Sequence, residues 1–125
     1  MKTVRIFNVT RDIDLCEKCG VASNIFTRVR GLLGRSTLQA GEGLLIIPCP
    51  SIHMFGMKFA LDVIFLSPEN IVTDYVENIA PGKFYLAQNH FGKAHSALEI
   101  IPGMIAETGT RRGDEIRIAP CTPAL

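Results

Sequence analysis

Residues 58–66 read KFALDVIFL, and this stretch carries the strongest signal for the fold. Successive side chains of a β-strand point to opposite faces of the sheet. Both faces of this stretch are apolar: Phe59, Leu61, Val63 and Phe65 on one side, Ala60, Ile64 and Leu66 on the other. A short run that is apolar on both faces is typical of a fully buried strand. We therefore expect Val63 and Phe65 to be among the most buried residues.

Turns and further strands surround this run. The sequence SPEN at 67–70 has a proline preset for the second turn position and an asparagine that can take a positive φ. Residues 71–79 should therefore return as an antiparallel strand. Other segments predict short strands at 4–9, 14–20, 43–48, 97–101 and 115–119, a polar loop at 83–95, and a turn or single helical turn at 104–108.

One segment has the periodicity of a helix. Between Ala22 and Leu33, apolar residues recur at the i, i+3, i+4 and i+7 spacing of an amphipathic helix. Ser23 can cap its start, and Gly34 suits a left-handed residue after its end. The pattern predicts one amphipathic helix near residues 23–33. Its apolar side should pack on the sheet through Ile25, Phe26, Val29 and Leu33.

Six or seven short strands with one helix predict a mainly β fold, either a small β-sandwich or an open barrel. A chain of 125 residues fits a single domain, which we place at 1–125. The chain is 47% hydrophobic and 20% charged, with a net charge of +1, as is usual for a globular protein. This near neutrality gives no electrostatic signal for nucleic acid, and no apolar run approaches the roughly 20 residues of a membrane-spanning helix.

The N-terminus and the cysteines bear on location. The first residues alternate polar and apolar side chains and include Asp12, without the apolar core of an export signal. We therefore expect a cytoplasmic protein whose four cysteines are reduced thiols. Cys16 and Cys19 have the spacing of a zinc knuckle or a redox pair, but no second pair of ligands accompanies them. We interpret them as small buried residues.

Several motifs occur in order along the chain: RVRGLLGR (28–35), GLLIIP (43–48), CPSIHMFGMKFALDVIFL (49–66), LEIIPG (98–103) and RRGDEI (111–116). Together they resemble the domain of unknown function 192 family, over about residues 4–119, with a short tail at 120–125. The resemblance implies a mainly β, jelly-roll-like fold and no established activity. The chain resembles those members that carry a C-x-x-x-H-x-x-x-M segment.

In this chain that segment consists of Cys49, His53 and Met57, which could together bind a soft metal such as copper or zinc. Residues four apart on a strand are separated by about 13 Å, whereas ligand atoms lie about 2.0–2.3 Å from a metal. Only a folded-back loop would therefore bring the three side chains to one ion. We favour ordinary packing roles and no cofactor, and keep a copper or zinc site as the alternative.

Asp62 places a carboxylate within the apolar strand. Its neighbours on the same face are Ala60 and Ile64, so the carboxylate should be buried and in need of a partner. We expect that partner to be an arginine of residues 28–35, since arginine can hold a carboxylate with two hydrogen bonds. A structural latch is favoured over an anionic-ligand site. Asp74, on the return strand, is expected to be more exposed.

The sequence favours a non-catalytic binding or accessory module for a small molecule or a protein. The candidate ligand site lies around His53 and the end of the predicted helix, and its candidate residues are Cys49, His53, Met57, Asp62, Arg30 and Arg35. A copper- or zinc-binding protein is one alternative. An enzyme of unknown reaction is the other, although the sequence has no recognisable nucleophile–base pair or phosphate-binding loop.

Overall fold

The computed structural model describes residues 2–23 and 36–121. Seven of its strands form one sheet in the order β6-β5-β8-β3-β2-β1-β9, and β4 and β7 form a second, two-stranded sheet. The strands are β1 (Thr3–Asn8), β2 (Ile13–Ala22), β3 (Glu42–Ile46), β4 (Ser51–His53), β5 (Leu61–Leu66), β6 (Val72–Ile79), β7 (Phe84–Leu86), β8 (Ser96–Ile100) and β9 (Ile116–Pro120). A short helix, α2 (Met104–Thr108), precedes β9.

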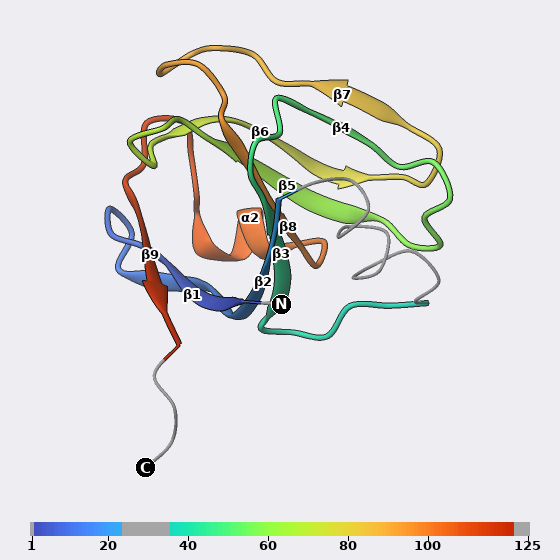
Figure 1. The fold of residues 1–125 in the computed structure, drawn as a ribbon, viewed down its shortest axis with the longest axis horizontal. Coiled ribbons are helices and arrows are strands. Elements are labelled where there is room, and N and C mark those ends of the chain that lie inside the picture. Colours follow the sequence, from blue (N-terminus) through green and yellow to red (C-terminus); the bar gives the residue numbers. More distant parts are fainter. Residues whose placement is uncertain (1, 24–35, 122–125) are drawn as a thin grey trace.

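The seven-stranded sheet curls until its two edge strands meet at their first residues. Ile71, just before β6, forms an isolated bridge with Glu115, just before β9. Next to it, the Val72 N–H donates to the Asp114 carbonyl at 2.9 Å. The result is an open barrel, with β4 and β7 lying across one side of it (Figure 1). The predicted mainly β, open-barrel class is confirmed.

Two apolar layers lie on opposite faces of the curled sheet. Leu61, Val63 and Phe65 of β5 face the layer beneath β4 and β7, whereas Ile64 and Leu66 face the layer that includes Ile105 of α2. All six residues of β5 are buried, and Val63 and Phe65 are 0% exposed. The prediction that this strand is buried on both faces is confirmed.

The structure adds detail that the sequence did not predict. The described residues contain nine strands, because two three-residue strands, β4 and β7, add to the seven that were predicted; β7 lies in the segment 83–95 expected to be a polar loop. The strand predicted from residue 58 begins at Leu61. The helical turn at 104–108 is present as α2. The helix predicted at 23–33 and its apolar contacts lie outside the described residues.

Across residues 2–23 and 36–121, no helix combines the length and the apolar character that crossing a membrane requires.

Candidate functional site

The two-stranded sheet presents its apolar side chains to the outside. β4 and β7 pair antiparallel, with Ile52 opposite Tyr85 and His53 opposite Phe84. Because side chains alternate along a strand, Ile52 points inward and is 2% exposed, whereas Phe84 is 61% exposed. Leu86, the next outward residue of β7, is 59% exposed.

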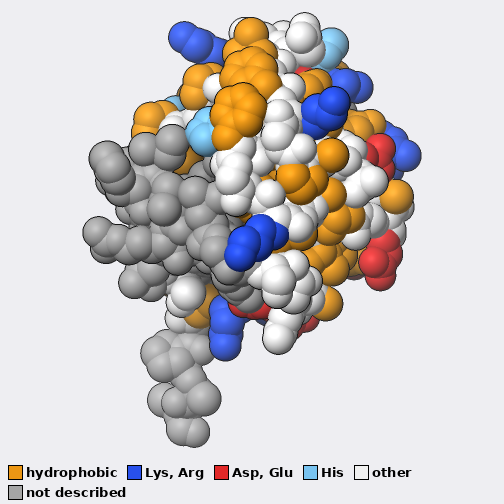
Figure 2. All heavy atoms as spheres, turned by 90° about the vertical axis from the view of Figure 1, so that its right-hand side faces the viewer, with side chains coloured by type: hydrophobic (Ala, Val, Ile, Leu, Met, Phe, Trp, Pro, Cys, Tyr) orange, Lys and Arg blue, Asp and Glu red, His pale blue; other side chains and the backbone are white. Residues whose placement is uncertain are grey.

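Phe55 extends this outward face just after β4. It is 58% exposed, and its ring stacks on that of His53 with 5.4 Å between the ring centroids. We call Phe55, Phe84 and Leu86 the apolar patch. In the space-filling view, hydrophobic side chains gather at the top of the molecule, with histidine and basic side chains beside them (Figure 2). Exposed apolar residues grouped on one face are typical of an interaction site.

The inward residue of β7 fixes this sheet to the barrel. The Tyr85 hydroxyl donates to Asp74 Oδ2 at 2.6 Å, and the Gln88 N–H donates to the same oxygen at 2.8 Å. The Tyr85 ring also stacks on Phe65, 5.9 Å between centroids. Arg112 holds the other carboxylate oxygen of Asp74 through Nη2 at 2.8 Å and Nε at 3.1 Å. The strand that carries Phe84 and Leu86 of the apolar patch is therefore hydrogen-bonded, through Tyr85, to a buried residue of the barrel.

Asp74 is 0% exposed, so the expectation that it is the more exposed aspartate is wrong. Burial favours a higher pKa for its carboxyl group, but the hydrogen bonds from Tyr85, from backbone N–H groups and from Arg112 outweigh burial and lower that pKa. Burial and the neighbouring carboxylate raise the pKa of Tyr85 to about 12. The pair is therefore a carboxylate and a neutral phenol at neutral pH.

Of the C-x-x-x-H-x-x-x-M residues, Cys49 and Met57 border the same apolar layer. Cys49 is partly buried, and its thiol donates to the Ser51 carbonyl at 2.8 Å. His53 lies on β4, with its Nδ1 atom buried. Met57 is 6% exposed and belongs to the apolar layer beneath the two-stranded sheet. Within the described residues, no three or more His, Cys, Asp or Glu side chains form a group suited to a metal. A soft-metal site that also uses Met57 stays an untested prediction.

Asp62 is buried as expected, at 0% exposed, and its carboxylate accepts three backbone N–H groups. Asn78 donates to Oδ1 at 2.8 Å, while Gly103 and Ile105 donate to Oδ2 at 3.1 and 2.9 Å. Asp62 therefore joins β5 to β6 and to the start of α2. Its predicted arginine partners, Arg30 and Arg35, lie outside the described residues.

Two further buried acids were not recognised from the sequence. Glu99 on β8 is 0% exposed and lies opposite Val63 of β5 and Leu44 of β3. Asp114 is 3% exposed and accepts hydrogen bonds from Asn8 and Arg11. In both cases the signal was a charged residue beside or inside an apolar strand, the same signal that singled out Asp62.

Cys16 and Cys19 are buried and adjacent inside the barrel. Their strand carries a bulge, so three steps along β2 match two along β1: Cys19 is opposite Val4 and Cys16 opposite Ile6. A hydrogen bond between the thiols lowers the pKa of Cys16 and, together with burial, raises that of Cys19. Both are free thiols. Their interpretation as small buried residues fits these positions.

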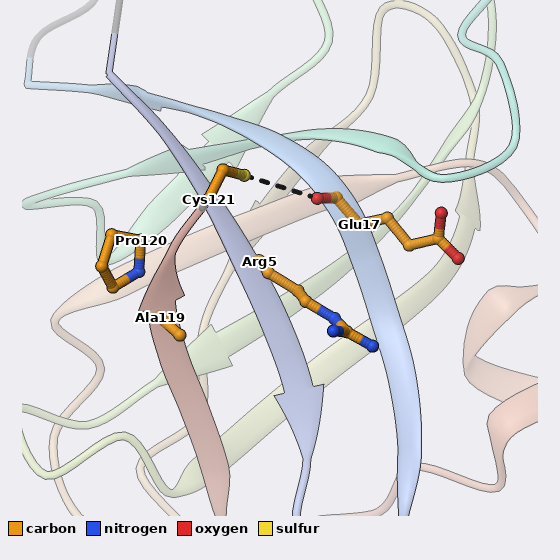
Figure 3. A pocket seen from close by; sticks show the side chains of 5 residues that line it. All are labelled: Arg5, Glu17, Ala119, Pro120 and Cys121. Carbon is orange, nitrogen blue, oxygen red and sulfur yellow. Dashed lines mark hydrogen bonds between the residues drawn. The ribbon is translucent and has the colours of Figure 1, made fainter. Parts of the chain in front are cut away.

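A pocket of about 620 Å³ lies on the outer side of β1, β2 and β9, lined by Arg5, Glu17, Ala119, Pro120 and Cys121 (Figure 3). Arg5 and Cys121 have partners within the protein. Arg5 forms an ion pair with Asp14 at 2.6 Å, and the Cys121 thiol lies 3.6 Å from the Glu17 carbonyl. The pocket shares no residue with the apolar patch.

Comparisons with known proteins agree with the fold. A protein of Sinorhizobium meliloti 1021, described as a candidate transcription regulator, superposes with a TM-score of 0.73 and 21% identity, covering 94% of this chain and 92% of that one. A protein of unknown function from Novosphingobium aromaticivorans DSM 12444 gives the same TM-score at 22% identity, covering 92% of this chain and 83% of that one. At such identities the likeness shows the fold alone. No curated protein matches the chain significantly.

The sequence matches the model of one family, DUF192, described as "Uncharacterized ACR, COG1430", over residues 8–118. The match includes every strand from β2 to β8 and the helix α2. Because it covers most of the 125 residues, this protein belongs to the DUF192 family.

Proposed function

We propose that this protein is a non-catalytic binding module whose recognition surface is the apolar patch beside His53. Its partner is a protein segment that inserts apolar side chains between Phe55, Phe84 and Leu86. The observation that carries the proposal is the exposure of these three large apolar side chains, 58, 61 and 59%, on one face of one small sheet. Buried aromatic side chains supply much of the binding energy at protein interfaces.

The support beneath the patch favours recognition by a preformed surface. Tyr85 lies between Phe84 and Leu86 and points inward to Asp74, so the backbone that presents both residues is anchored to the barrel. A surface that is already ordered loses less conformational entropy when it binds. This arrangement fits a docking site better than it fits a catalytic centre, which would need convergent reactive groups.

A library of random displayed nine-residue peptides, selected on the wild-type protein, tests the proposal. We expect enriched peptides that are rich in apolar residues. They should bind at least about tenfold more weakly to a Phe84→Ser, Leu86→Ser double variant, because each truncation removes apolar area from the interface. Both residues are exposed, so the variant should keep its fold, which circular dichroism checks.

Phe91→Ser is the matched control. Phe91 is 53% exposed, and its ring lies beside Gly113. Gly113 is in the turn that leads to β9. Its replacement should leave peptide binding unchanged. Selection that yields no peptide sensitive to the double variant, or peptides equally sensitive to Phe91→Ser, would overturn the proposed function.

The proposal extends to the cellular location and to the subgroup of the family. Cys16, Cys19 and Cys121 are free thiols, which fits the reducing cytoplasm. Fractionation of cells that express the protein tests that location. We also place the chain with the family members that carry C-x-x-x-H-x-x-x-M, on the basis of Cys49, His53 and Met57.

A further inference from the structure

The strand β7 has one unpaired edge. It pairs with β4 on one side, and within the described residues no strand pairs with its other side. Hydrogen bonds flank the pair on both ends: the Met54 N–H donates to the Lys83 carbonyl, and the Ala87 N–H donates to the Pro50 carbonyl. In an antiparallel pair, residues that exchange backbone hydrogen bonds with the partner strand alternate with residues whose N–H and C=O groups point away from it. The backbone N–H and C=O groups of Phe84 and Leu86 therefore point away from β4.

The side chains at this edge are the outward apolar ones. An edge strand with free backbone groups can pair with an extended segment from another protein, in which backbone hydrogen bonds supply affinity and alternate side chains supply specificity. Phe84 and Leu86 provide both features, since their backbone groups face the edge and their side chains belong to the apolar patch.

The segments that form this sheet and its loops carry charged side chains of one sign. Residues 48–60 and 80–95, which include β4, β7 and their adjoining loops, contain no aspartate or glutamate. They hold all three histidines of the chain and three lysines, Lys58, Lys83 and Lys93, and all three lysines are exposed. Since the whole chain has a net charge of +1, the rest of it carries −2. The unpaired edge therefore lies in the basic part of a nearly neutral protein.

Building on the proposed function, we infer that the partner is an extended, acidic segment of another protein that adds a strand to the edge of β7. Its apolar side chains alternate beside Phe84 and Leu86, and its carboxylates lie near Lys83. Complementary charge selects the partner and its orientation. A second copy of this chain would bring like charges together at the edge, which disfavours self-pairing.

The test uses the tightest-binding peptide from the selection described above, made synthetically in three forms. One form carries N-methyl groups on its odd-numbered residues, one on its even-numbered residues, and one has every Asp and Glu replaced by Asn and Gln. Alternate N–H groups of an added strand face β7 and the others face away. We expect one N-methylated form to bind at least tenfold more weakly and the other to bind nearly as well as the parent.

Charge is tested on both sides of the interface. The neutral peptide should bind the wild-type protein at least threefold more weakly than the parent peptide does. The parent peptide should bind the Lys83→Glu variant more weakly by a similar factor. Lys18→Glu is the control, because Lys18 is exposed on β2, outside residues 48–60 and 80–95. Raising the salt concentration should reduce the difference between the acidic and the neutral peptide.

The outcomes separate this inference from the proposed function. If both N-methylated forms bind as tightly as the parent, strand addition is wrong, while docking on the patch through side chains survives. If the neutral peptide binds equally well, or Lys18→Glu acts as strongly as Lys83→Glu, the acidic partner is wrong. A selection that yields no peptide whose binding depends on the apolar patch overturns both the proposed function and this inference.

Discussion

Asp62 caps the helix α2 through Ile105, whose backbone N–H donates to Asp62 Oδ2 at 2.9 Å. The same carboxylate accepts the N–H groups of Gly103 and Asn78. The two residues are far apart in the sequence, and one buried side chain thereby ties β5 to β6 and to α2. A carboxylate suits this position because both of its oxygens are acceptors.

We expect Asp62→Asn to lower the free energy of unfolding. An amide has a single acceptor oxygen, so at least one backbone N–H of Asn78, Gly103 or Ile105 would face an NH₂ group. Each buried N–H left without an acceptor costs about 1–3 kcal/mol. Urea unfolding gives the measurement.

Asp12→Asn is the control for that change. Asp12 is exposed and has a φ of 56°, a conformation that asparagine adopts readily. The free energy of unfolding of the Asp12→Asn variant should stay within about 0.5 kcal/mol of the wild-type value. Equal, small effects of the two substitutions would contradict the capping role of Asp62.

Acid should destabilise the protein in part through Asp74. Its folded-state pKa is lowered, because the hydrogen bonds from Tyr85, from backbone N–H groups and from Arg112 outweigh burial. A lowered pKa contributes stability that is fully present above the unfolded-state pKa, about 3.9 for aspartate, and that is lost as pH falls through the folded-state value. The free energy of unfolding should therefore decrease below about pH 4.

Asp74→Asn removes this titration, so its free energy of unfolding should change less between pH 5 and pH 2.5 than that of the wild type. The absolute stability of the variant should also be lower at pH 7, because Tyr85 and Arg112 lose a charged partner. Urea unfolding at a series of pH values measures both quantities. A pH dependence equal to that of the wild type would show that Asp74 titrates normally in the folded protein.

Asp74 also shows where sequence reasoning reaches its limit. The pattern of residues 58–66 predicted β5 with both of its faces, because a period of two is a local property. The burial of Asp74 depends on Tyr85 and Arg112, 11 and 38 residues further along the chain. Partners at such separations are brought together only by the register of the sheet.

The candidate site was only partly predicted from the sequence, for the same reason. The sequence singled out His53, but β4, which contains it, and the neighbouring β7 have three residues each, too few to establish a periodicity. Phe84 appeared to be a loop residue, and its position opposite His53 is set by pairing between these two short strands. The apolar patch could therefore be recognised only in three dimensions.

Phe65→Ala should be among the most destabilising substitutions in β5. Phe65 is 0% exposed, and its ring stacks on that of Tyr85 beneath β7. Truncation of a buried phenylalanine costs about 3–5 kcal/mol, from lost burial and from the cavity left behind. Thermal or urea unfolding should show a loss in this range, whereas Phe91→Ala, at an exposed position, should cost less than about 1 kcal/mol. Comparable losses would mean that the packing of β5 is misplaced.

Thiol reactivity should follow burial. Cys121 is exposed, whereas Cys16 and Cys19 are 1% and 0% exposed. With an aromatic disulfide reagent, the native protein should show a fast-reacting thiol that disappears in Cys121→Ser. Cys16 and Cys19 should react only after denaturant is added, since the reagent cannot reach a buried sulfur. Rapid reaction of two further thiols in native Cys121→Ser would contradict their placement inside the barrel.

Metal titration decides between packing and ligand roles for Cys49, His53 and Met57. The thiol of Cys49 donates to the Ser51 carbonyl, and Met57 is part of the apolar layer beneath β4. Since a metal needs ligand atoms about 2.0–2.3 Å away, these environments favour packing. Calorimetric titration with copper(I) or zinc should then give no saturable binding with a Kd at or below about 1 μM, a free energy of about −8 kcal/mol. One-to-one binding that is lost in both His53→Ala and Met57→Leu, yet kept in His90→Ala, would instead establish the soft-metal site.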